Sequence, residues 1–200
     1  MKILKNPQSI NYINFKKWAT GTECMWSYIP SSTAGDGSDT NVKGKQKDLP
    51  FYTRTILKRP ENKYRYSRLE HADTNETHGV IDVLNEILEF NDIGVSSYLR
   101  ISLNCVHPEK EVYNSLPHTD HQIPHGNIII YLTDAGGKTF VESEDNSECY
   151  DAHDPHEDDI ILFSGKHFMQ NPLDKRRVIL VATIQPLWPE FYNSQINTNV

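Results

Sequence analysis

The sequence predicts a mainly β fold with one supporting helix. Residues 77–90 carry apolar side chains at helical spacing, whereas from residue 96 onward short strand-like runs alternate with polar loops. The run 128–132 is continuously apolar, as expected of a strand that is covered on both faces. One helix followed by about seven antiparallel strands is the layout of a double-stranded β-helix, the cupin-like jelly roll.

Composition narrows the classes of function. The 200 residues suit a single domain, and the net charge of -7 argues against a nucleic-acid partner, which usually meets a basic surface. No apolar run is long enough to cross a bilayer, and residues 1–15 lack the apolar core of a signal peptide. Three cysteines without CxxC spacing favour reduced thiols. We therefore expect a cytoplasmic protein with no membrane or nucleic-acid partner.

The single domain, 1–200, divides into three parts by composition. Residues 1–96 are expected to hold N-terminal strands and the support helix, and the segment 6–20 to hold a short strand and a helical turn. Residues 31–48 are rich in Ser, Gly, Asp and Lys, which predicts a flexible loop that acts as a lid or recognition loop. Residues 97–185 form the predicted double-stranded β-helix core, and 186–200 a C-terminal tail.

The support helix should pack one apolar face on the sheet. Ile81, Leu84 and Leu88 share that face, and Gly94 follows at a distance where helices end.

Within the core, the strand 98–105 alternates. One face carries Ile101, Leu103 and Cys105, and the other carries Arg100, Ser102 and Asn104. Residues 160–163 and 178–184 are predicted to be buried strands, and 143–158 an acidic loop that leaves His153 and His156 in solvent.

The chemistry centres on the segment 116–140. His118 and Asp120 are one residue apart in a strand-like stretch, so both would point to the same face. An imidazole and a carboxylate side by side make two-thirds of the two-His-one-carboxylate ligand set of non-haem Fe(II) oxygenases. His167, at the end of a distant apolar run, is the candidate third ligand.

The order His118-Thr119-Asp120, then His167, then an arginine nine or ten residues later resembles the Fe(II)/2-oxoglutarate-dependent oxygenases. The resemblance covers residues 97–185 and is strongest to the prolyl-4-hydroxylase-like branch and its short phage-encoded relatives. Supporting stretches are Tyr98-Leu99-Arg100-Ile101, Tyr131-Leu132-Thr133-Asp134, Gly136-Gly137-Lys138-Thr139 and Phe163-Ser164-Gly165.

The resemblance implies a hydroxylase that binds Fe(II) through His118, Asp120 and His167. Its co-substrates would be 2-oxoglutarate and dioxygen, with ascorbate as a supporting reductant, and its products would include succinate and CO2. The substrate would be a peptidyl proline, another protein or peptide side chain, or a small molecule.

The distal carboxylate of 2-oxoglutarate needs a cation, and a guanidinium can meet it with two parallel hydrogen bonds. Arg176 and Arg177 both stand at the right spacing, and strand periodicity cannot choose because both faces of the strand are apolar. The resemblance favours Arg177, which precedes a valine. It also implies that Tyr131 assists with this carboxylate, although core packing explains Tyr131 equally well. Asn104 is a further candidate for the pocket wall.

Two other classes of protein fit the same residues. One is a zinc hydrolase that uses His118, His121 or His125. We read His121 and His125 instead as loop residues near the pocket mouth, because structural zinc sites usually include cysteines at short spacing. A jelly-roll metal- or ligand-binding module without oxygenase turnover is the second alternative.

Overall fold

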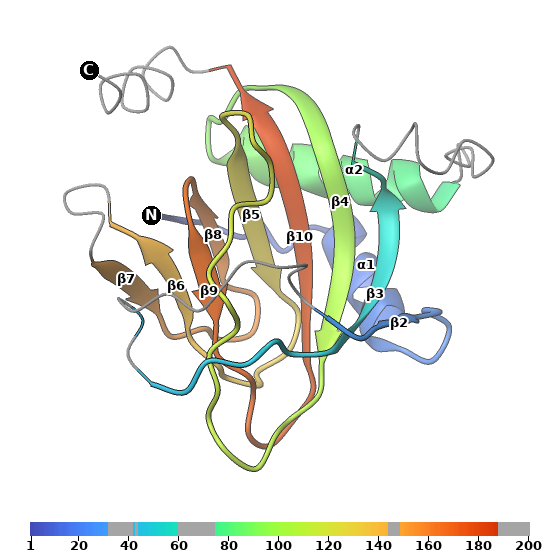
Figure 1. Ribbon diagram of the computed structural model, residues 1–200. Helices are drawn as coiled ribbons and strands as arrows, with labels where there is room; N and C mark the ends of the chain where they lie inside the picture. The colour runs from blue at the N-terminus through green and yellow to red at the C-terminus, as the bar shows by residue number, and fades with distance from the viewer. Residues whose placement is uncertain (32–41, 43, 60–74, 144–148, 188–200) are drawn as a thin grey trace, which may run out of the picture.

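The computed structural model describes residues 1–31, 42, 44–59, 75–143 and 149–187, which form two antiparallel sheets and two helices (Figure 1). The large sheet has the strand order β1-β8-β5-β10-β4-β3-β2, and the small sheet has the order β7-β6-β9. The large sheet comprises β1 (Lys2–Leu4), β2 (Ser27–Ile29), β3 (Phe51–Leu57), β4 (Val95–Val106), β5 (Gly126–Tyr131), β8 (Ile160–Phe163) and β10 (Arg177–Pro186). The small sheet comprises β6 (Thr139–Glu142), β7 (Tyr150–His153) and β9 (His167–Met169). The predicted fold class, a mainly β jelly roll, is confirmed.

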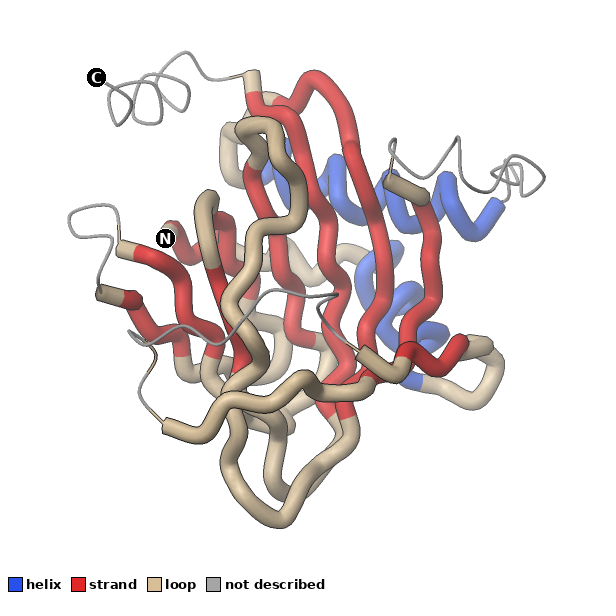
Figure 2. The backbone as a smooth tube through the Cα atoms, viewed as in Figure 1, coloured by secondary structure: helices blue, strands red, loops and turns tan. Residues whose placement is uncertain are grey.

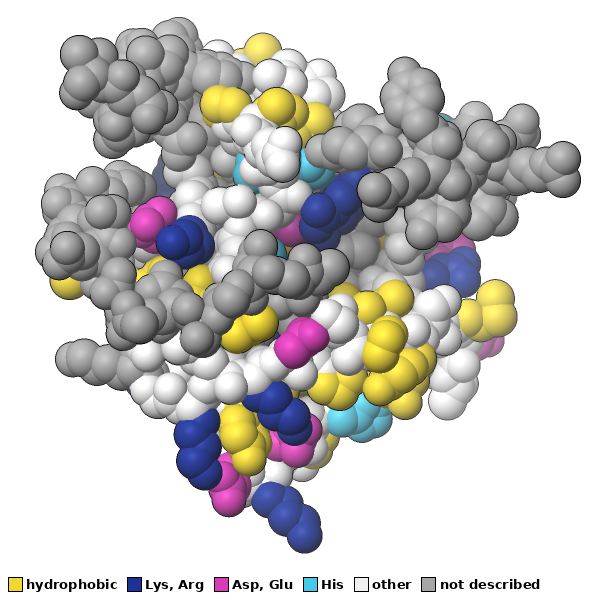
Figure 3. All heavy atoms as spheres, viewed as in Figure 1, with side chains coloured by type: hydrophobic (Ala, Val, Ile, Leu, Met, Phe, Trp, Pro, Cys, Tyr) yellow, Lys and Arg dark blue, Asp and Glu magenta, His cyan; other side chains and the backbone are white. Residues whose placement is uncertain are grey.

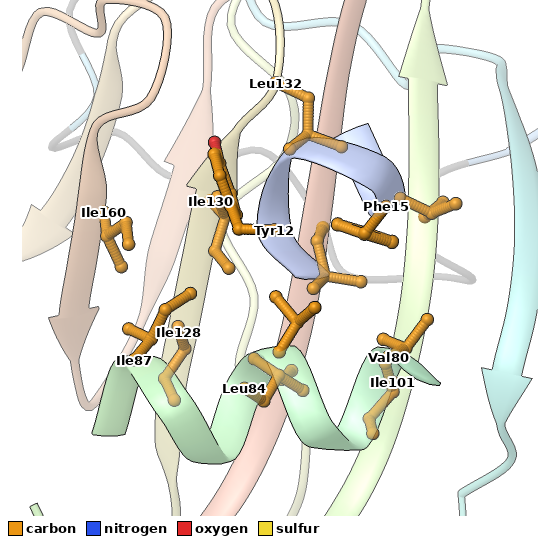
Figure 4. Packing of buried hydrophobic residues seen from close by; sticks show 14 of the residues in the cluster. Tyr12, Phe15, Val80, Leu84, Ile87, Ile101, Ile128, Ile130, Leu132 and Ile160 are labelled. Atoms are coloured by element: carbon orange, nitrogen blue, oxygen red, sulfur yellow. The ribbon is translucent and has the colours of Figure 1, made fainter. Parts of the chain in front are cut away.

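Both helices, α1 (Ile10–Thr20) and α2 (Asn75–Phe90), cover the same face of the large sheet (Figures 1 and 4). On α2, helical periodicity buries one apolar stripe against the sheet. The buried members of this stripe are Val80, Val83, Leu84, Ile87 and Leu88. The predicted helix is confirmed, and it ends at Phe90 as expected.

Helix α1 is longer than the helical turn that the sequence suggested. The Ser9 hydroxyl caps it by accepting a hydrogen bond of 3.1 Å from the Tyr12 backbone N–H. Tyr12, Phe15 and Ala19, at helical spacing, are its buried residues. Tyr12 and Phe15 lie beside the α2 stripe in the apolar layer (Figure 4). Burial of these side chains therefore stabilises a helix whose own apolar periodicity is weak.

Strand β10 lies at the centre of the large sheet and separates two environments (Figures 1 and 2). It pairs with β4 on one side and β5 on the other. Because strand side chains alternate, Val178, Leu180 and Ala182 join the core under the helices. Arg177, Ile179 and Val181 point to the opposite face, which lines a cavity.

Three expectations need correction or lie beyond the described residues. The acidic segment 143–158 contains strand β7. The His153 side chain is only 12% exposed, with its ring near that of Tyr131, whereas the His156 side chain is 80% exposed. The stretch around His118 is not a full strand and forms an isolated antiparallel bridge with His167. Most of the predicted loop 31–48, positions 32–41 and 43, lies outside the described residues.

None of the helices in the described part of the chain is both long and apolar enough to cross a bilayer.

Candidate functional site

A cavity of about 130 Å³ opens on the face of the large sheet that the helices do not cover. Figure 3 shows basic, acidic and histidine side chains together at the centre of the face viewed. The residues that line the cavity are Leu49, Phe51, Arg59, Arg100, Asn104, Val106, Ser115, His118, Asp120, His167, Met169, Arg177, Ile179 and Val181. The structure therefore brings five of the six predicted site residues to one cavity, all except Tyr131.

His118 and His167 enter the cavity from adjacent backbones. The two residues form an antiparallel bridge with backbone N–H to O distances of 3.0 and 2.9 Å, and their ring centroids are 4.6 Å apart. Each ring uses its Nδ1 to donate to the carbonyl two residues earlier, that of Leu116 at 3.1 Å and that of Gly165 at 3.4 Å. A neutral imidazole that donates through Nδ1 keeps a lone pair on Nε2. Both rings are therefore set up to bind a metal through Nε2.

Burial keeps His167 in the form that a metal requires. His167 is 3% exposed, and this burial, with the His118 ring nearby, lowers the pKa of His167 to about 3. At neutral pH its imidazole is uncharged, and an imidazole must be unprotonated at the nitrogen that binds a metal.

Asp120 presents its two carboxylate oxygens to different partners. Oδ1 lies 2.9 Å from an Nη2 of each of two arginines, Arg59 and Arg100. Arg59 also donates to the Asp120 backbone carbonyl at 2.6 Å. Oδ2 is buried, has no hydrogen-bond partner and lies 3.8 Å from the His167 Nε2.

The charges around Asp120 keep it ionised. Burial by itself would raise the pKa of this carboxyl, but the Arg100 guanidinium and the other positive charges beside it hold the pKa well below its ordinary value. An ionised carboxylate with one bare buried oxygen calls for a cation at that oxygen.

The donor atoms are of the types that Fe(II) binds: two imidazole Nε2 atoms and one carboxylate oxygen, from residues that line one cavity. As they stand, no three His, Cys, Asp or Glu side chains among the described residues form an assembled metal cluster. A bound ion would therefore have to draw the three side chains together.

Arg177 is a buried guanidinium without an anion among its described contacts. It is 2% exposed, and its Nη1 donates to the backbone carbonyls of Gly137 at 2.8 Å and Gln170 at 2.7 Å. Its Nε has no hydrogen-bond partner. Burial lowers the pKa of Arg177 to about 10, which reflects the cost of an uncompensated charge in this position. Arg176 is exposed and donates to the Thr20 carbonyl at 2.6 Å, away from the cavity.

Tyr131 and Asn104 occupy different positions relative to the cavity. Tyr131 is fully buried behind the wall, where its hydroxyl forms a hydrogen bond of 2.6 Å with the Thr139 hydroxyl. Burial raises the pKa of Tyr131 to about 12, so the hydroxyl stays protonated. Asn104 lines the cavity, and its side-chain oxygen accepts a hydrogen bond of 3.0 Å from Thr53.

His121 and His125 lie in a loop, as the sequence suggested, but they are buried and do not stand at the mouth of the cavity. Their exposed fractions are 6% and 5%, and their rings meet edge to face at 4.9 Å. His121 Nε2 is 2.8 Å from the Thr183 hydroxyl, and neither histidine lines the cavity. Because they lie outside the cavity wall, they do not join the three candidate ligands.

Sequence reasoning missed the role of Arg59. It stands two residues after β3 and 61 positions before Asp120, so no local pattern connects the two. The alternation of β4 did place Arg100 on the same face as Asn104, which was the one available signal for Arg100.

Solved structures resemble this fold. An oxidoreductase of the 2OG-Fe(II) oxygenase family from Burkholderia pseudomallei matches 90% of this chain and 79% of its own, with a TM-score of 0.61 and 13% identity. A prolyl hydroxylase from Trichoplax adhaerens, in complex with a hypoxia inducible factor peptide fragment, covers 96% of this chain and 93% of its own, with a TM-score of 0.47 and 10% identity. A prolyl-4-hydroxylase from Pseudomonas putida covers 88% of this chain and 100% of its own, with a TM-score of 0.42 and 12% identity.

The likeness to the Burkholderia pseudomallei structure, at 13% identity, shows the fold alone. No protein-family model and no curated protein matches the sequence. Any activity therefore has to be argued from the residues of the cavity.

Proposed function

We propose that this protein is an Fe(II)- and 2-oxoglutarate-dependent dioxygenase. In the proposed reaction, 2-oxoglutarate and dioxygen react with a substrate C–H bond to give the hydroxylated substrate, succinate and CO2. The observation that supports it best is that one cavity is lined by the His118, His167 and Asp120 donors together with the buried Arg177 guanidinium.

In this proposal, the Nε2 atoms of His118 and His167 and the bare Oδ2 of Asp120 would hold the iron. When bound, Fe(II) supplies the positions at which the oxo acid and dioxygen react. The backbone bridge between the two histidines and their Nδ1 hydrogen bonds orient both rings before any metal arrives.

Arg177 would bind the distal carboxylate of 2-oxoglutarate. Its two backbone carbonyl acceptors fix the guanidinium, and a carboxylate would supply the charge that its described contacts lack. Ile179 and Val181 line the cavity beyond it along the same strand face. These apolar side chains would keep water away from the methylene carbons of the co-substrate.

Tyr131 would support this end of the site from behind. Its hydroxyl is bound to Thr139, and we propose that it positions the wall around Arg177 instead of contacting the co-substrate. Asn104 would contribute a polar contact from the neighbouring strand β4, where it pairs in register with Ile179.

The primary substrate would be a protein or peptide side chain, as in the peptidyl proline hydroxylation that the family resemblance suggests, or a small molecule. We expect turnover of 2-oxoglutarate without primary substrate to be slow but measurable.

The deciding experiment measures binding and turnover of 2-oxoglutarate. Wild-type protein with Fe(II) in air should release succinate, and protein loaded with Mn(II) should bind 2-oxoglutarate in a calorimetric titration. Asp120→Ala should lose both. Wild-type protein that binds a metal but neither binds nor consumes 2-oxoglutarate would instead support a jelly-roll binding module without turnover.

A further inference from the structure

The guanidinium of Arg177 has one edge at which an anion can bind. Nη1 is already used, because it donates to the backbone carbonyls of Gly137 at 2.8 Å and Gln170 at 2.7 Å. The other edge consists of Nη2 and of Nε, which has no hydrogen-bond partner in the described part of the chain. The N–H groups of Nε and Nη2 are parallel, the geometry that a carboxylate meets with two hydrogen bonds. A carboxylate that binds Arg177 therefore approaches this edge.

The side chain of Met169 lies at the same edge. Its Sδ is 3.6 Å from the Arg177 Nη2 and accepts a hydrogen bond from it. A thioether sulfur is a weak, uncharged acceptor, so a carboxylate would take its place on Nη2. Because the carboxylate and the sulfur need the same N–H group, a bound carboxylate would displace the sulfur and lie against the Met169 side chain.

Arg177 has no room to move back from a longer ligand. A Cβ added at Gly137 would lie 2.7 Å from the Arg177 Nη1 and 2.7 Å from the Gln170 carbonyl oxygen, so this side of the guanidinium is tightly packed. The Met169 backbone is held as well, since its N–H donates to the Ser115 hydroxyl at 3.0 Å and its carbonyl accepts from the Ser115 N–H at 2.8 Å. The flexible thioether side chain is thus the part that sets the space beside the guanidinium.

Met169 also lies between the two groups that would anchor the co-substrate. It follows His167 by two positions on β9, and both residues line the cavity. Two strand residues span roughly 7 Å, and residues at this spacing share a face. An oxo acid that reaches from the proposed metal ligands to Arg177 therefore runs alongside the Met169 side chain.

We propose that Met169 determines the length of the 2-oxo acid that this protein binds, an inference that rests on the proposed function. Its side chain fills the space that a longer dicarboxylic oxo acid would need. 2-Oxoadipate, one methylene group longer than 2-oxoglutarate, would have to fold its extra carbon toward Met169, because Arg177 is held in place. An apolar pocket discriminates against one methylene group by roughly tenfold or more.

The test compares the affinities of 2-oxoglutarate and 2-oxoadipate for Mn(II)-loaded protein by calorimetric titration. Wild-type protein should bind 2-oxoglutarate at least tenfold more tightly than 2-oxoadipate. Met169→Ala should reduce this ratio at least fivefold, through tighter binding of 2-oxoadipate. Met169→Leu keeps most of the side-chain volume and should retain the wild-type ratio. Met25→Ala is the matched control, because Met25 is 71% exposed and lies outside the cavity.

An unchanged ratio in Met169→Ala, or equal affinities for the two acids in wild-type protein, would overturn the proposal. The proposed function would then still stand, because 2-oxoglutarate binds. If Met169→Ala does not fold, Met169→Val provides the same test, since valine suits a strand and is also smaller than methionine. Its ratio should be intermediate, and an unchanged ratio would again overturn the proposal. Absence of 2-oxoglutarate binding to wild-type Mn(II) protein would overturn this proposal and the proposed function together.

Discussion

His118 and His167 are joined by two backbone hydrogen bonds, of 3.0 and 2.9 Å, although they lie in different parts of the chain. This bridge places their rings 4.6 Å apart on one cavity wall. The separation of two candidate ligands is thus determined by backbone pairing, which is more rigid than contact between side chains.

The first prediction concerns the metal. Asp120→Ala should abolish Mn(II) binding in calorimetric titrations, because it removes the one oxygen that faces His167 without a partner. Asp82→Ala, on the exposed face of α2, is the control and should bind as wild type does. His121→Ala should also retain the metal, since His121 lies outside the cavity. Unchanged Mn(II) affinity in Asp120→Ala would contradict the ligand assignment.

The second prediction compares the two adjacent arginines. Arg177→Ala should raise the apparent constant for 2-oxoglutarate well over tenfold, because loss of a buried charge partner costs on the order of 2 to 5 kcal/mol. Arg176→Ala should change this constant little, because its guanidinium is bound to the Thr20 carbonyl at the surface. Steady-state kinetics with 2-oxoglutarate as the varied substrate measures this constant for both variants. A large increase in Arg176→Ala and none in Arg177→Ala would assign the anion site to Arg176.

The third prediction uses two neighbouring glycines. Gly136 and Gly137 have φ values of 64° and 84°, so alanine at either costs roughly 1–2 kcal/mol in stability. At Gly137 the added Cβ would also lie 2.7 Å from the Arg177 Nη1, whereas at Gly136 it would contact nothing. Gly137→Ala should therefore weaken 2-oxoglutarate binding more than fivefold, and Gly136→Ala should leave it nearly unchanged. Equal affinities in the two variants would show that the Arg177 position tolerates this displacement.

The fourth prediction concerns pH and the metal-free protein. Burial lowers the pKa of His167 from 6.5 to about 3, so between these values the unfolded chain takes up a proton that the folded protein does not. The free energy of unfolding should be unaffected by this group above pH 6.5 and should fall as the pH decreases below it. From pH 6.5 to 5.5 the loss should be about 1 kcal/mol.

Urea denaturation at a series of pH values measures this loss. His167→Gln should remove that part of the pH dependence, whereas His156→Gln, at a side chain that is 80% exposed, should leave it in place. The same slope in wild type and His167→Gln would mean that another group carries the effect.

Much of the fold could be predicted because it depends on local patterns. The apolar spacing of 77–90 predicted a helix, and the continuous run 128–132 predicted a strand buried on both faces. The alternation of β4 correctly separated Ile101 and Leu103, under the helices, from Arg100 and Asn104, on the cavity side. Helix α1 was underestimated because burial against α2 and the sheet, and not its own periodicity, stabilises it.

The sequence by itself predicted the candidate metal ligands, His118, Asp120 and His167, and an arginine that follows His167 nine or ten residues later. Strand periodicity could not tell which of Arg176 and Arg177 faces the cavity, because the residues on both faces of β10 are apolar. The tertiary structure packs helices on one face of this strand, which leaves Arg177 buried on the cavity side and Arg176 at the surface. It also brought Arg59 to Asp120 across 61 residues, an ion pair that no local pattern encodes because only the folded sheet makes the two neighbours.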